Sequence, residues 1–172
     1  MLSAVRIPIC FFVTAAVTAL ALGVAHAQQL EETRKTGVTQ MSSQAKGTFE
    51  VSLTAQPLAD AAANEKLGRM AIDKRFSGDL IGNSKGEMLS AMTDTKGSAG
   101  YVAIERVEGS LNGRKGSFVL QHNGVMTRGL PQLSVTVVPD SATGDLAGLA
   151  GKFKIDIVDK KHFYDFQYSL PK

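Results

Sequence analysis

The sequence predicts an all-β protein, a single antiparallel barrel of eight strands. About eight short segments between residues 47 and 170 alternate apolar and polar side chains, which is the period of a strand with one wet face. Glycines and turn dipeptides separate these segments at short intervals. No segment has the period of a convincing amphipathic helix. Because closure removes unpaired strand edges, we favour a barrel over a sandwich.

The first 27 residues have the composition of a secretory signal peptide. Arg6 precedes an apolar run over residues 7–22, and Ala25-His26-Ala27 has the small residues of a cleavage site. The apolar run is short for a membrane span. We therefore expect cleavage after Ala27, a periplasmic or secreted protein, and no membrane association after cleavage.

The composition bears on disulfide and thiol chemistry and on nucleic-acid binding. The only cysteine, Cys10, lies in the signal peptide, so the mature chain has neither a disulfide nor a thiol. Cleavage also removes Arg6, which lowers the formal net charge of +3 by one. No cluster of basic side chains with interleaved aromatic residues is present. We therefore expect no nucleic-acid partner.

The rest of the chain divides into a tether and a domain. Residues 28–45 are polar and lack both the strand period and the helix period, which predicts a flexible tether. The barrel domain is predicted over residues 46–172, a length that suits one hydrophobic core.

The expected strands follow one another along the domain. The first starts at Gly47, where every second residue is apolar. A loop over residues 55–66 separates it from two strands within residues 67–92. The turn between these two strands is expected at either Ser77-Gly78-Asp79 or Gly82-Asn83.

The second and third strands carry methionines on their apolar side. Met70, Ile72 and Phe76 alternate with polar residues, and Lys74 interrupts this apolar side. Met88 follows on the third strand. Because flexible thioethers form an adaptable apolar wall, Met70 and Met88 are candidate ligand-binding residues, and core filling is the alternative.

The fourth and fifth strands are expected to form a hairpin over residues 100–126. Asn112-Gly113 suits the positive φ angles of a tight hairpin turn. The loop has an even length whether it contains two or four residues. Glu105 and His122 therefore fall on the same face, which is otherwise apolar.

A carboxylate beside an imidazole on an apolar face is the most informative polar placement in the chain. Glu105 and His122 can hold a tautomer, orient a polar ligand atom or move a proton. The alternative is a pair that only satisfies two polar groups on a wall. We take both as candidate catalytic and ligand-binding residues. The other candidate ligand-binding residues are Tyr101, Met70, Met88 and Phe118.

Three further strands are expected, at residues 133–138, 153–157 and 162–170. The glycine-rich loop over residues 139–151 lacks a phosphate-binding motif and opens no helix. Its glycines therefore indicate a bend with close packing.

Two further patterns bear on catalysis and metal binding. Gly82-Asn83-Ser84-Lys85-Gly86 matches G-x-S-x-G, but a nucleophile elbow needs a following helix, so we interpret Ser84 as a turn or strand residue. His122 and His162 are the only histidines of the mature chain, and they lie in different strands without cysteine partners. We therefore predict no metal site and no cofactor.

Three long segments resemble a known bacterial family. They are LGRMAIDKRFSGDLIGNSKGEMLSA, KGSAGYVAIERVEGSLNGRKGSFVLQHNG and PQLSVTVVPDSATGDLAGLAGKFKIDI. They resemble the domain-of-unknown-function family 3224, over about residues 47–170. Such proteins are similar in fold to the allene oxide cyclase-like, or calycin-like, barrel. The loop over residues 141–151 resembles the glycine-rich turn of allene oxide cyclases and plant dirigent proteins. The resemblance implies a fold and no activity.

An eight-stranded barrel is either filled by side chains or holds one small ligand. We favour an exported protein that binds a small, largely apolar ligand, with polar contacts from Glu105, His122 and Tyr101. The first alternative is an isomerase or lyase that uses the same pocket, so the question of enzymatic activity stays open. The second is a structural or assembly barrel without a ligand. By analogy with the cyclases and dirigent proteins, this class predicts a homo-oligomer such as a trimer.

Overall fold

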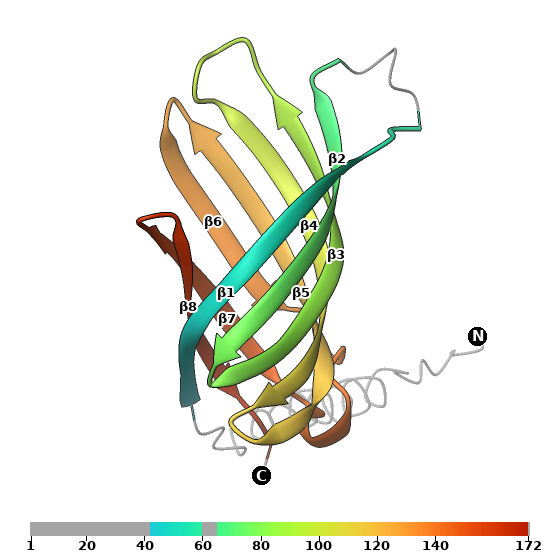
Figure 1. Ribbon diagram of the computed structural model, residues 1–172, viewed down its shortest axis with the longest axis vertical. Helices are drawn as coiled ribbons and strands as arrows, with labels where there is room; N and C mark the ends of the chain where they lie inside the picture. Colours follow the sequence, from blue (N-terminus) through green and yellow to red (C-terminus); the bar gives the residue numbers. More distant parts are fainter. Residues whose placement is uncertain (1–41, 60–64, 172) are drawn as a thin grey trace, which may run out of the picture. The chain divides into compact units, whose positions relative to one another are not determined.

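The computed structural model describes residues 42–59 and 65–171 (Figure 1). Within these residues, eight strands pair antiparallel in sequence order and close into one barrel, which confirms the predicted fold. The strands are β1 (Ser42–Gln56), β2 (Leu67–Gly78), β3 (Leu80–Met92), β4 (Ala99–Leu111), β5 (Arg114–Thr127), β6 (Leu130–Val137), β7 (Ala150–Val158) and β8 (Lys161–Ser169).

The predicted signal peptide, residues 1–27, and residues 28–41 of the predicted tether lie outside the described residues. The last four residues of the predicted tether, 42–45, belong instead to β1, where they pair with β8. In this stretch Ala45 is fully buried and the three preceding residues are exposed. A single small apolar residue gives no visible alternation, and the partner strand lies at the far end of the chain. The sequence pattern therefore did not indicate where β1 begins.

The β4–β5 turn lies at the predicted Asn112-Gly113, and the β2–β3 turn lies at one of its two candidate sites, Ser77-Gly78-Asp79. β2 and β3 are joined at Asp79, after Gly78 with a φ of 110°. β4 and β5 are joined by Asn112-Gly113 alone, with φ angles of 48° and 84°. Positive φ at both central residues is the geometry that Asn-Gly favours in a two-residue hairpin loop.

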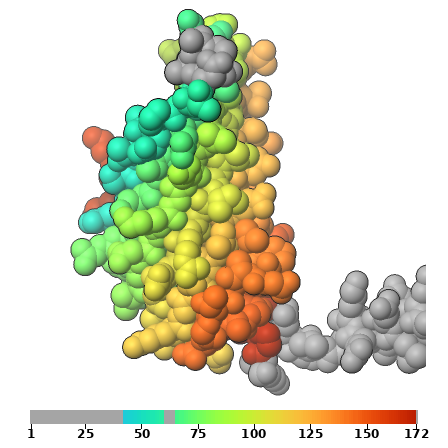
Figure 2. Space-filling model, turned by 90° about the vertical axis from the view of Figure 1, so that its right-hand side faces the viewer, coloured from blue at the N-terminus to red at the C-terminus, as the bar shows by residue number. Residues whose placement is uncertain are grey.

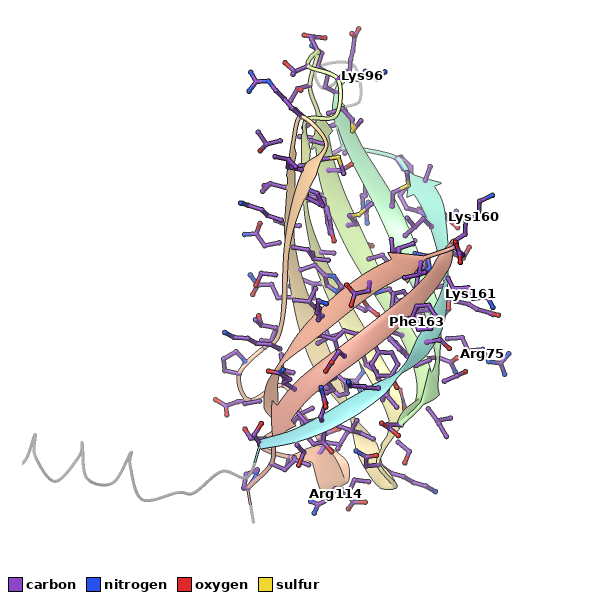
Figure 3. All side chains as sticks on the ribbon, turned by 90° about the vertical axis from the view of Figure 1, so that its left-hand side faces the viewer. Arg75, Lys96, Arg114, Lys160, Lys161 and Phe163 are labelled. Atoms are coloured by element: carbon purple, nitrogen blue, oxygen red, sulfur yellow. The ribbon has the colours of Figure 1, made fainter. Side chains whose placement is uncertain are left out.

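The barrel is closed by eight strands in its lower half only. On one side, the pairing of β8 with β1 ends at His162 opposite Phe49. On the other, β6 and β7 pair at Thr136 and Lys152. Figure 3 shows Lys160, in the β7–β8 turn, well below Lys96 in the β3–β4 loop. Strands β1 to β6 therefore continue past the β7–β8 hairpin as the wall of an upper half (Figure 1).

Aromatic side chains fill the lower half. Phe166 stacks on Phe118 with 5.7 Å between ring centroids and lies 5.2 Å from Phe153. Two tyrosines of β8 also bind the lower turns. The backbone N–H of Leu80 donates to Tyr164 Oη at 2.8 Å, and Asn112 Nδ2 donates to Tyr168 Oη at 2.9 Å. The buried aromatic residues of this region are Phe49, Phe76, Phe118, Phe153, Tyr164, Phe166 and Tyr168.

The glycine-rich segment after β6 packs at the lower end of the barrel (orange in Figure 2). It contains the short 3₁₀ helix η1 (Gly144–Leu146). The Thr143 N–H donates to the Ser117 carbonyl at 2.8 Å, and Leu146 and Leu149 are buried in the core. The close packing expected of this loop is therefore present. Across the described ranges, the chain has no helix of the length and apolarity needed to cross a membrane.

Candidate functional site

Four polar side chains from four adjacent strands meet inside the barrel: Lys74 of β2, Ser84 of β3, Glu105 of β4 and His122 of β5. Lys74 and Ser84 are directly opposite each other, and His122 is opposite Ala103, two residues before Glu105. The relative exposures of the four are 7%, 2%, 0% and 3%, in the order given. We call these four residues the polar cluster. It lies where the closed lower half meets the upper half, because Lys74 pairs with Val51, beyond the last β1–β8 pair.

The Glu105 carboxylate is the centre of the cluster. Lys74 Nζ donates to Glu105 Oε2 at 2.6 Å, and Ser84 Oγ donates to Oε1. His122 Nε2 lies 2.9 Å from Oε2. The sequence prediction that Glu105 and His122 share an inner face is correct, because the two-residue turn has the even length that it required.

The contact of His122 with Glu105 is close but poorly directed. Although Nε2 lies within ion-pair distance of the carboxylate, it forms no well-aligned hydrogen bond within the described residues. The short Nε2–Oε2 distance suggests a hydrogen bond, whereas the poor angle argues against one. We follow the angle, because hydrogen bonds weaken steeply when they are bent. A buried nitrogen in this state retains hydrogen-bonding capacity.

Aromatic rings surround the lysine side chain. Lys74 Nζ lies 4.9 Å from the Phe49 ring centroid and 6.0 Å from that of Phe76. The faces of aromatic rings attract cations at these distances. The rings and Glu105 together hold an ammonium group away from water, where an unpaired charge would be costly.

The polar cluster keeps Glu105 ionised. Burial acts to raise the pKa of this carboxyl, but His122, Lys74 and Ser84 together outweigh burial and lower the pKa from 4.5 to about 2. A carboxylate with so low a pKa is a weak proton acceptor. The chemistry left to Glu105 is therefore to orient and pair its neighbours.

The lowered pKa predicts a loss of stability in acid. A carboxyl whose pKa is lower in the folded state stabilises the fold above its unfolded pKa, and here this contribution disappears as pH falls from about 4.5 to about 2. Its full size is about 3 kcal/mol. Urea unfolding of the wild type and of Glu105→Gln, measured from neutral to acidic pH, should show the difference between their stabilities narrowing below about pH 4.5. A difference that stays constant to about pH 3 would contradict the low pKa.

A cavity of about 350 Å³ lies in the upper half of the barrel. Its wall comes from β3 to β6 and is mostly apolar. The residues that line it include Met88, Ser90, Tyr101, Gly124, Met126 and Leu133. A larger groove, about 490 Å³, is lined by the exposed, outward-facing Leu89 and Val102, and no residue of the polar cluster lines either space. The cavity of about 350 Å³ is therefore the one relevant to an inner ligand.

Tyr101 lies at the boundary between this cavity and the polar cluster. Tyr101 pairs with Gly124, and its ring occupies the space where a side chain on residue 124 would begin. On each strand the next inward position belongs to the row of Ala103 and His122. Burial, and secondarily the charge of Glu105, raise the pKa of the Tyr101 hydroxyl. This raised pKa keeps the hydroxyl neutral and able to donate a hydrogen bond.

The structure brings most of the predicted site residues into two adjoining groups. Glu105 and His122 lie in the polar cluster, and Tyr101 and Met88 line the cavity. Met70 is half-buried opposite Met88. Phe118 is buried in the lower aromatic core against Phe166. The roles of all six in ligand binding stay predictions.

Sequence reasoning missed two members of the polar cluster, Lys74 and Ser84. Lys74 gave a signal, because it was the one charge on an otherwise apolar strand face. Ser84 gave none, and it lies inside strand β3 rather than at a nucleophile elbow. In residues 42–59 and 65–171, no three side chains among His, Cys, Asp and Glu gather in a way that could hold a metal ion.

Comparisons with known proteins give a family. No curated protein matches the chain. A solved structure from Shewanella oneidensis MR-1, described as a protein with unknown function from the DUF3224 family, is 50% identical with a TM-score of 0.72; the match covers 77% of this chain and all of that one. The expected similarity to allene oxide cyclases stays a prediction. Residues 45–168 match the family described as "Protein of unknown function (DUF3224)", and the chain therefore belongs to this family.

Proposed function

We propose that the protein binds a small, largely apolar molecule in the upper half of its barrel. The observation that carries the proposal is the apolar cavity of about 350 Å³ directly beside a buried polar cluster. Ligand sites are commonly cavities of about 300–1,000 Å³ with apolar walls and a few convergent polar groups. The signal-peptide pattern of residues 1–27 supports export of the same protein.

The polar groups lie at one end of the cavity. Ser90 and Tyr101, which both carry a hydroxyl group, line the cavity. On β5, the inward-facing residue next to Gly124 on the side of the polar cluster is His122. A ligand that fills the cavity with its apolar part therefore directs its polar end towards Tyr101 and the polar cluster. Binding is favoured over catalysis because Glu105 is ionised, accepts hydrogen bonds from Lys74 and Ser84 and lies beside His122, which makes it a poor base.

Calorimetric titration with methyl decanoate, a neutral apolar probe, tests the proposal. Met126 and Leu89 are both exposed apolar side chains, but only Met126 lines the cavity. We expect Met126→Glu to weaken binding at least tenfold, about 1.4 kcal/mol, because a carboxylate at the cavity wall opposes an apolar ligand. The matched variant Leu89→Glu should leave the affinity unchanged. Absence of binding by the wild type, or equal affinities of the two variants, would overturn the proposal.

A further inference from the structure

We infer that the natural ligand is an apolar molecule ending in a carboxylic acid, and that this acid binds at Lys74 and His122 and transfers its proton to His122. The inference rests on the proposed function and adds the chemical class of the ligand. It follows from the balance of donors, acceptors and charges in the polar cluster.

The polar cluster has more hydrogen-bond donors than acceptors. An ammonium group has three N–H donors, and within the described residues Lys74 Nζ has a single hydrogen-bond partner, Glu105. Ser84 Oγ donates to the same carboxylate, and His122 Nε2 lies 2.9 Å from it without a well-aligned hydrogen bond. Buried donors require acceptors. The polar end of a ligand that fits here must therefore supply acceptor atoms, as a carboxyl group does.

The net charge of the polar cluster determines whether a proton must enter together with the carboxyl group of the ligand. Lys74 and Glu105 form a buried pair whose charges cancel. An added carboxylate would leave a net negative charge inside the barrel, which is costly without compensation. One added proton restores neutrality. The ligand therefore enters the barrel as the neutral acid, or an equivalent proton is taken from the solvent.

His122 is the group placed to receive this proton. The titratable groups that face it are Lys74 from β2, and Glu105 and Tyr101 from β4, while its β6 neighbour is the apolar Val135. Lys74 is already paired with Glu105, a raised pKa keeps the proton on the Tyr101 hydroxyl, and a lowered pKa makes Glu105 a weak proton acceptor. The O–H bond of the acid breaks, an N–H bond forms on the imidazole, and the electron pair stays on the ligand carboxylate. An imidazolium donates from both ring nitrogens, so it can serve Glu105 and the ligand together.

Tyr101 is the bulky residue between the cavity lining and the next inward row of β4 and β5, which leads to the polar cluster. Gly124 lines the cavity, and the next inward row places Ala103 opposite His122. The Tyr101 ring packs over Gly124 at this boundary. The carboxyl group therefore meets Tyr101 first and the polar cluster next.

Calorimetric titration of the folded protein with decanoic acid and with methyl decanoate, each in two buffers of different ionisation enthalpy, tests the inference. We expect the acid to bind at least tenfold more tightly than the ester, with uptake of about one proton at neutral pH and an affinity that falls as pH rises. His122→Gln should abolish the proton uptake, and Lys74→Met should reduce the affinity for the acid to that for the ester. Lys85→Met is the matched control, because this exposed lysine pairs with Asp73 outside the cluster.

Comparison of decanoic acid with methyl decanoate distinguishes failure of this inference from failure of the proposed function. If acid and ester bind equally, or if proton uptake survives in His122→Gln, the inference is overturned while the proposed function stands. If neither probe binds, both fail. Retained binding of the ester by the two cluster variants shows that they are folded, so that a selective loss of acid binding supports the inference.

Discussion

Replacing Glu105 with leucine is expected to lower the free energy of unfolding by about 3–5 kcal/mol, because the change leaves the buried Lys74 ammonium without its counter-charge. Lys74 is only 7% exposed, so water cannot replace the lost partner. The Phe49 and Phe76 rings near Nζ compensate weakly, since a cation–π contact contributes about 2 kcal/mol when desolvated. Urea unfolding at neutral pH measures the change.

The double variant Glu105→Leu/Lys74→Met separates the unpaired charge from the lost packing. It removes both charges and should recover most of the stability, because a buried ion pair adds little over apolar residues of similar size. Glu87→Leu is the outer control. Glu87 pairs with Arg69 at 2.7 Å on the exposed face, where an ion pair contributes little. A loss below about 1 kcal/mol in Glu105→Leu would mean that Lys74 leaves the interior when its partner is removed.

Phe166→Ala is expected to cost about 3–5 kcal/mol, the range for truncating a buried phenylalanine. Phe166 is fully buried, and its ring contacts those of Phe118, Phe153 and Tyr168. Neighbours held by the surrounding barrel wall cannot collapse to fill the space, so the cavity term is near its full size. Chemical unfolding followed by far-ultraviolet circular dichroism gives the difference.

Phe163 supplies the matched control on the same strand. Three residues earlier on β8, it faces outward and is 39% exposed (Figure 3). Phe163→Ala removes the same atoms from the surface and should change the stability much less. Similar losses in the two variants would argue against the aromatic lower core as the main source of stability.

Much of the fold was readable because strand alternation and turn chemistry are local. Asn112-Gly113 specified a tight turn, and an even loop length then set Glu105 and His122 on one face, as the structure bears out. The turn at Asp79 stayed ambiguous in the sequence, since two glycine-containing sites competed. Only the pairing of β2 with β3 over the full strand length selects one of them.

The candidate site was predicted in part, for a physical reason. Its two halves on β4 and β5 belong to one hairpin, whose geometry is set within about 20 residues by the turn. Lys74 and Ser84 come from the preceding hairpin, and their relation to Glu105 depends on the pairing of β3 with β4. No local pattern fixes that register.

The sequence alone determined the strand periodicity, the Asn112-Gly113 turn, the family resemblance and the placement of Glu105 and His122 on one face. Only the tertiary structure decided that Lys74 is buried against that carboxylate, that β1 begins at Ser42, and that the barrel is filled below and hollow above. These features depend on where strands distant in sequence end and on the register in which they meet. Period and propensity fix which face a side chain occupies, whereas closure of the barrel fixes which side chains share its interior.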